Sequence, residues 1–206
     1  MNDQIFETVV TTLAPGGRPH VAPMGVRYRE GRVVLMPFRP STTLDNIAAS
    51  GCAVLNLVTD TRVFAGCVTG RRDWPLLPAE AVPCVRLAAA LRHVELRLAA
   101  PIDPQAERPV LQMERVREAT HAPFDGFNRA QAAVIEGAVL VRRLSMLPPD
   151  KIDAEMAYLQ IAIDKTAGPA EHEAWGWLVA AVRRHRGHDD GDDSPNPTTT
   201  LKGARA

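Results

Sequence analysis

Basic and hydroxyl side chains gather where a short helix is predicted to begin, at Arg39, Ser41, Thr42 and Thr43. We predict that Thr42 is the N-cap residue and that Asp45, three positions later, completes a capping box. Capping needs fewer hydroxyl groups than this, and Arg39 adds positive charge where the helix dipole already favours anions. The segment therefore predicts a site for one phosphate-sized anion. The alternative, that these groups only cap a surface helix, stays open.

A second group of residues suits a flat ligand. Pro23 and Gly25 interrupt a predicted strand, where proline removes a ladder hydrogen bond and glycine lets another group approach the backbone. They indicate either a bulge at the rim of a barrel or a backbone on which a planar ring lies. Asn56 stands in an otherwise apolar strand and needs a partner if it is buried. That partner is either a neighbouring loop or the same ligand.

Asn128 and Arg129 open a further predicted helix. In one interpretation Asn128 caps the helix and Arg129 lies in solvent, and in the other both face a ligand. No other side chain has the surroundings expected of a general acid or base, so we assign no catalytic residue. The GxGxxG, P-loop, HExxH and GxSxG motifs are absent, which removes the usual sequence support for dinucleotide folds, P-loop enzymes, zincins and lipase-like hydrolases.

The composition excludes some classes of partner. The chain has 206 residues, and its 24 basic residues balance 24 acidic ones, so no global charge attracts nucleic acid. No apolar run approaches the roughly 18 residues of a membrane helix, and no signal peptide is evident. The three cysteines are widely spaced and the histidines do not cluster, so we expect no metal site and no disulfide framework. We expect a cytoplasmic protein.

These residues must be positioned by a mainly β region followed by helices. Alternating or β-branched runs predict strands over 5–13, 20–28, 32–37, 52–59, 63–68 and 92–99, with 109–121 as a candidate last strand. Strands at this spacing favour an antiparallel barrel. Amphipathic segments predict helices over 128–147, 149–166 and 169–186. We divide the chain into a barrel (1–122), a helical subdomain packed on it (123–187) and a disordered tail (188–206).

Several sequence blocks together resemble a known superfamily. They are APMGV, PFRPSTTLDNI and AVLNLVTD, with FNRAQAAVIEGAV further along the chain. They resemble the FMN-binding split-barrel superfamily, and within it the domain-of-unknown-function (DUF) family 447. The resemblance implies a mainly β fold with α: an antiparallel split β-barrel followed by a C-terminal helical subdomain. It also implies a homodimer that binds FMN non-covalently near the subunit interface.

The resemblance further implies a role for each candidate site residue. The phosphate group would contact Arg39, Ser41, Thr42 and Thr43. The isoalloxazine ring would lie against Met24, Gly25 and Val26, with Asn46 and Asn56 nearby and Asn128 and Arg129 closing the pocket. Because flavin carries hydride or single electrons, we expect an FMN-dependent oxidoreductase acting on an unidentified small molecule. The alternative is a non-catalytic flavin carrier or sensor.

Overall fold

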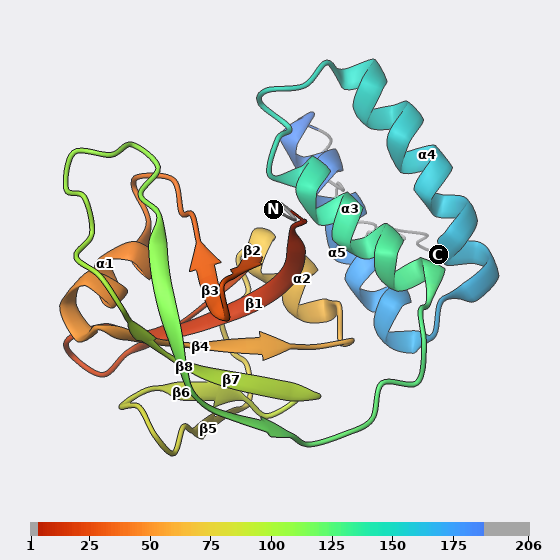
Figure 1. Cartoon of the computed structure of the whole chain (residues 1–206). Helices are drawn as coiled ribbons and strands as arrows, with labels where there is room; N and C mark the ends of the chain where they lie inside the picture. The colour runs from red at the N-terminus through yellow and green to blue at the C-terminus, as the bar shows by residue number, and fades with distance from the viewer. Residues whose placement is uncertain (1–3, 188–206) are drawn as a thin grey trace, which may run out of the picture.

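The computed structural model describes residues 4–187, which form a β-barrel with a group of helices beside it (Figure 1). In chain order the elements are β1 (Phe6–Leu13), β2 (Pro19–Arg29), β3 (Arg32–Leu35), α1 (Thr42–Ser50), β4 (Cys52–Leu57), α2 (Arg62–Val68), β5 (Leu76–Pro78), β6 (Val85–Leu87), β7 (Arg92–Leu98), β8 (Leu111–Thr120), α3 (Arg129–Val141), α4 (Pro149–Thr166) and α5 (Pro169–His185). The predicted disordered tail, 188–206, lies outside the described residues. Within them, no helix is long and apolar enough to cross a membrane.

The barrel is closed, and its strands follow one another in the order β1-β2-β3-β8-β7-β4. Every neighbouring pair is antiparallel. Alternate side chains point inward and are apolar, among them Val10, Val26, Leu35, Leu55 and Leu96, which are all fully buried. The predicted fold class, a mainly β antiparallel barrel followed by helices, is confirmed.

The turn between β2 and β3 leaves part of β2 without a strand neighbour. Glu30 and Gly31 both have positive φ, 51° and 77°, as two-residue hairpin turns of type I′ require. β3 is short and pairs with β2 only over Val26–Arg29. From Pro19 to Gly25, β2 pairs with β1 on one side, and no strand in the described part of the chain pairs with its other edge. α2 contacts this stretch, since Cys67 Sγ donates a hydrogen bond to Val21 O at 3.5 Å.

The strand predicted over 63–68 is wrong, because these residues form α2. Asp60 favours the helix, since its Oδ1 accepts a hydrogen bond from the Arg62 backbone N–H at 3.1 Å. A short apolar run suits a buried helix as well as a buried strand, so periodicity alone does not separate them. In Figure 1, α2 lies between the barrel and the C-terminal helices. Its Phe64 shares one core with Val9 of β1 and Leu178 of α5.

Two strands that the sequence analysis missed, β5 and β6, form a separate small sheet against the barrel. A buried carboxylate fastens the loop between them. Glu95 of β7 accepts hydrogen bonds from the backbone N–H groups of Glu80, Ala81 and Val82 at 2.9, 2.6 and 2.9 Å. Burial alone would raise the pKa of Glu95, but these N–H groups and the His93 ring outweigh burial and lower the pKa.

Candidate cofactor site

The N-cap of α1 lies one residue earlier than predicted. Ser41, not Thr42, is the N-cap: its backbone is extended (φ −148°, ψ 117°), and its Oγ accepts a hydrogen bond from Leu44 N at 3.3 Å. Thr42 is already helical, so Asp45 lies one position too late for a capping box. Gly51 ends the helix as expected, with a φ of 67° that glycine adopts readily.

Thr42 and Asn46, four residues apart on one face of α1, line a hollow of about 840 Å³. Asn46 is held there by a hydrogen bond from its Nδ2 to Thr12 Oγ1 of β1, at 2.9 Å. The other walls come from the β1–β2 turn, the start of β2 and the segment that joins α2 to β5. They comprise Ala14, Arg18, Pro19, His20, Val21, Arg72, Asp73, Trp74, Pro75 and Leu76.

The hollow is rich in basic groups. Arg18, His20 and Arg72 line it, and Asp73 is the one acidic side chain among the described lining residues. Burial lowers the pKa of His20, and the positive charges of Arg72 and Arg18 lower it further. The sequence analysis did not single out these three residues, because Arg72 lies about fifty residues from Arg18 and His20 and they form no motif. Their proximity is a product of the fold.

The predicted ring-binding residues lie on β2. Val26 is fully buried in the barrel interior, and Met24 packs against the same core. Thr8 Oγ1 donates a hydrogen bond to Met24 O at 2.8 Å. A Cβ atom at Gly25 would lie 2.7 Å from Ile5 Cγ2, so the approach of the residue just before β1 explains the glycine without a ligand. Met24 and Gly25 lie in the part of β2 before its pairing with β3, Val26 pairs with β3, and none of the three lines the hollow.

Arg39 is not among the residues that line the hollow. Its Nε donates to Ala106 O at 3.0 Å and its Nη2 to Asp103 O at 3.5 Å, so the guanidinium holds the β7–β8 loop. Thr43 is buried. Of the four residues predicted to contact phosphate, Thr42 is the one that lines the hollow. Contact of the others with a ligand stays a prediction.

The side-chain amide of Asn56, which was predicted to lie near the ligand, forms its hydrogen bonds within the protein. The Nδ2 of buried Asn56 donates to Val9 O and Thr11 Oγ1, both at 3.1 Å, and its Oδ1 accepts from Leu87 N at 2.8 Å. The partners of Asn56 are therefore the strands β1 and β6, neither the neighbouring loop nor a ligand that the two interpretations named. Contact of Asn56 with a ligand stays a prediction.

Asn128 has a similar structural role at α3. Its Oδ1 caps the helix by accepting from Ala130 N at 2.7 Å, and its Nδ2 donates to Thr166 O at 3.0 Å. Arg129 is exposed. These contacts favour the capping interpretation within one chain, and a ligand role for the two residues stays a prediction.

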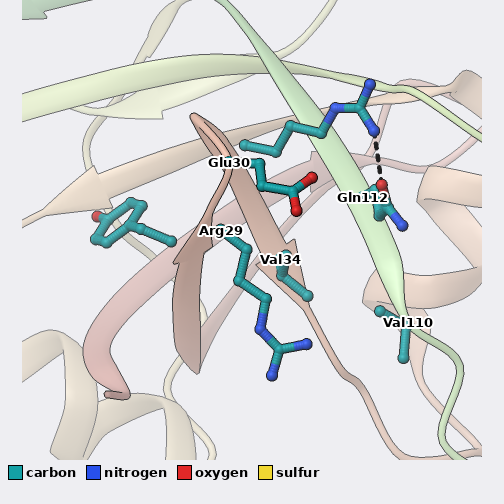
Figure 2. A pocket seen from close by; sticks show the side chains of 7 residues that line it. Arg29, Glu30, Val34, Val110 and Gln112 are labelled. Atoms are coloured by element: carbon teal, nitrogen blue, oxygen red, sulfur yellow. Dashed lines mark hydrogen bonds between the residues drawn. The ribbon is translucent and has the colours of Figure 1, made fainter. Parts of the chain in front are cut away.

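A second hollow, of about 330 Å³, lies beside the β2–β3 hairpin and β8 (Figure 2). Arg29, Glu30, Val34, Val110 and Gln112 are labelled there, and the dashed line to Gln112 marks a hydrogen bond donated by an arginine of β3. None of the predicted site residues lines this hollow. The hollow beside α1 is therefore the stronger candidate.

Comparison with protein families gives two matches. Residues 6–122 match the N-terminal domain of the protein of unknown function DUF447, and residues 128–180 match its second part. No curated protein matches this chain.

Comparison with solved structures gives further matches, of which the first shares the fold. An FMN-bound protein of Methanosarcina mazei, described under DUF447, has a TM-score of 0.74 at 19% identity, over 87% of this chain and 96% of that one. The 2-nitrobenzoate 2-nitroreductase of Pseudomonas fluorescens has a TM-score of 0.49 at 19% identity, over 59% and 66% of the two chains. A flavoredoxin of Methanosarcina acetivorans has a TM-score of 0.49 at 12% identity, over 59% and 74%.

Proposed function

This chain belongs to the DUF447 family, and we propose that it binds FMN non-covalently in the hollow beside α1. The observation that carries the proposal is the meeting of two features in one place. The hollow contains basic side chains and the first turn of α1, which suit a phosphate. Its wall at His20 and Val21 belongs to the part of β2 that pairs with no second strand among the described residues. Val21 O accepts from Cys67 Sγ at 3.5 Å, so the backbone groups beyond Val21 are the ones that this edge would offer to a flat ring. The FMN bound to the Methanosarcina mazei protein supports the same ligand.

The residues present fit this cofactor in chemical terms. Thr42 supplies a hydroxyl group, and the first backbone N–H groups of α1 lack intrahelical partners, so both suit phosphate oxygens. The edge of β2 from Ala22 to Gly25 would lie along the ring. Pro23 has no N–H to offer, and successive N–H groups of a strand point to opposite edges, so donors on the edge of Pro23 would come from residues two positions away, such as Gly25. FMN, when bound, would supply hydride or single-electron transfer, and the protein would orient it.

We further propose a homodimer in which the partner completes the pocket. Phe127 is 100% exposed and Phe124 is 55% exposed, and their rings pack edge to face with centroids 5.2 Å apart. An aromatic pair exposed to this extent, just before α3, suits a protein interface. Arg129 lies two residues after Phe127 and would reach the pocket of the partner. The proposed activity is redox chemistry on a small molecule, and the second candidate is a flavin carrier or sensor.

The first experiment is the visible spectrum of the purified protein. We expect a yellow protein with about one FMN per chain, released on denaturation, and weaker binding of FAD because the hollow offers one basic cluster. A colourless protein that does not bind added FMN at micromolar concentration would refute the proposal. Steady-state oxidation of a nicotinamide donor then separates the oxidoreductase from the carrier, since a carrier shows no turnover.

Light scattering combined with Arg129→Ala tests the shared pocket. The proposal predicts a dimer that loses flavin when Arg129 is removed. A monomer carrying full FMN would exclude the shared pocket, and a dimeric Arg129→Ala variant with full FMN would leave Arg129 as a surface charge. Lys151→Ala on exposed α4 is the control for loss of one positive charge.

A further inference from the structure

We infer that the FMN phosphate is held by Arg18, His20 and Arg72 rather than by Arg39, and that binding is accompanied by uptake of a proton at His20. This inference rests on the proposed function and extends it. It assigns the charge of the ligand to specific side chains and makes the affinity depend on pH.

The first argument is the convergence of like charges. Three basic side chains from the β1–β2 turn, β2 and the α2–β5 segment line one hollow, where only Asp73 among the described residues offers a compensating carboxylate. Burial lowers the pKa of His20, and the charges of Arg72 and Arg18 lower it further, so protonation of the imidazole beside them is unfavourable. A ligand with two negative charges offsets this repulsion. The hollow therefore suits a phosphate monoester better than a neutral or cationic ligand.

The second argument is that the fold fixes the Arg72 guanidinium and the backbone at Arg18. Arg72 Nη1 donates to Cys67 O and Arg71 O, both at 2.9 Å, which fixes the guanidinium while its other N–H groups remain for a ligand. The backbone of Arg18 closes the β1–β2 turn by accepting from Ala14 N at 3.0 Å, and its exposed side chain extends from this fixed point. The preorganised Arg72 guanidinium loses less conformational entropy on binding.

Register fixes the third member of the cluster. His20 is paired with Thr12 of β1, and Thr12 Oγ1 accepts the Asn46 hydrogen bond from α1 at 2.9 Å. His20 is therefore tied to the same helix that supplies Thr42. Arg39, by contrast, does not line the hollow, and its guanidinium donates to Ala106 O and Asp103 O of the β7–β8 loop.

The sign of the pH dependence follows from linkage. A bound dianion favours the charged imidazole, so the pKa of His20 is higher in the complex than in the free protein. The extra affinity is fully present below the pKa of the free protein and is lost as pH rises through the pKa of the complex. FMN also loses charge below about pH 6, where its phosphate takes up a proton. The wild type and His20→Gln bind the same phosphate, so the difference between the pH dependences of their FMN affinities isolates the contribution of His20.

Flavin-free protein is titrated with FMN and with riboflavin, which lacks the phosphate, by flavin fluorescence. Arg18→Ala and Arg72→Ala should each weaken FMN about tenfold or more while changing riboflavin affinity little. Arg97→Ala, which removes an exposed charge from β7, is the control. The inference is overturned if Arg39→Ala loses the preference for FMN over riboflavin while Arg18→Ala and Arg72→Ala keep it.

Calorimetry in two buffers of different ionisation enthalpy measures proton uptake. The wild type should take up protons with FMN near neutral pH, more than with riboflavin, and His20→Gln should lose that excess. Equal uptake by both proteins overturns the role of His20, provided that their melting temperatures agree. A wild type that binds neither flavin refutes the proposed function and the inference together. A wild type that binds both flavins equally refutes the inference alone.

Discussion

Replacing Gly66 by alanine should displace Trp74 and so distort the hollow beside α1. Gly66 lies in α2, and a Cβ atom there would lie 2.6 Å from both Cη2 and Cζ2 of Trp74. Ordinary contact begins at 3.4 Å, so the indole ring must move by roughly 0.8 Å. Trp74 lines the hollow, and a rigid ring cannot yield by changing a terminal torsion. The substitution therefore moves one wall of the proposed flavin site.

Two opposing terms set the size of the effect. Overpacking of this kind costs about 1–3 kcal/mol. Replacing glycine by alanine inside a helix gains about 0.5–1 kcal/mol. We expect a net loss of about 0.5–2 kcal/mol in the free energy of unfolding, together with weaker FMN binding. Gly176→Ala in α5 is the matched control, since no heavy atom lies within 4 Å of its Cβ position and the gain alone remains.

Urea unfolding and FMN titration of both variants measure these effects. The two substitutions should change stability in opposite directions, and only Gly66→Ala should alter flavin affinity. If Gly66→Ala stabilised the protein as much as Gly176→Ala, the Trp74 ring would have to move without cost, and the reasoning from close contact would be wrong. Lower stability with unchanged FMN affinity would show that Trp74 does not form part of the flavin site.

Three further substitutions test other parts of the fold. Gly137→Ala would place a Cβ 2.8 Å from Trp175 Cζ3 and should destabilise the protein by about 1–2 kcal/mol in urea unfolding, whereas a gain would mean that α3 and α5 separate freely. Glu95→Gln should cost about 2–3 kcal/mol. Because the pKa of Glu95 is lowered from 4.5, wild-type stability should fall as pH drops below that value, and an equal fall in the variant would contradict this account. Trp177→Leu removes the ring that lies 3.8 Å from the Arg71 guanidinium. It should weaken FMN binding while lowering the melting temperature little, and parallel titrations and thermal scans would check both.

The sequence predicts the parts of this fold whose signals are local. The barrel strands alternate with period two, so their positions are close to the observed β1, β2, β3, β4 and β7. Prolines and a glycine bound α4 and α5, and the predicted limits agree with the observed ones to within a residue. α2 was missed because Val63 to Val68 has no polar residue to reveal a helical period. β5 and β6, of three residues each, are too short to show any period.

The candidate site was predictable only where it lies on one segment. The hydroxyl groups at the start of α1 are adjacent in the sequence, and they do mark the helix whose first turn lines the hollow. Arg18 and Arg72 are brought together by the β1–β2 turn and by the end of α2, which was predicted as a strand. A local pattern thus pointed to Arg39, the nearest cation in sequence, whereas the fold brings more distant cations to the hollow.

The C-terminal helices contact the segment that carries Arg72. Arg71 stacks on Trp177 of α5 with its guanidinium 3.8 Å from the ring, and the next residue is Arg72, whose side chain lines the hollow. Arg71 also donates to Thr69 Oγ1 at 2.9 Å, so the end of α2 is held from both sides. A shift of α5 would therefore move Arg72 and the wall that follows it. Through this contact, the C-terminal helices would influence the proposed flavin site at the edge of the barrel.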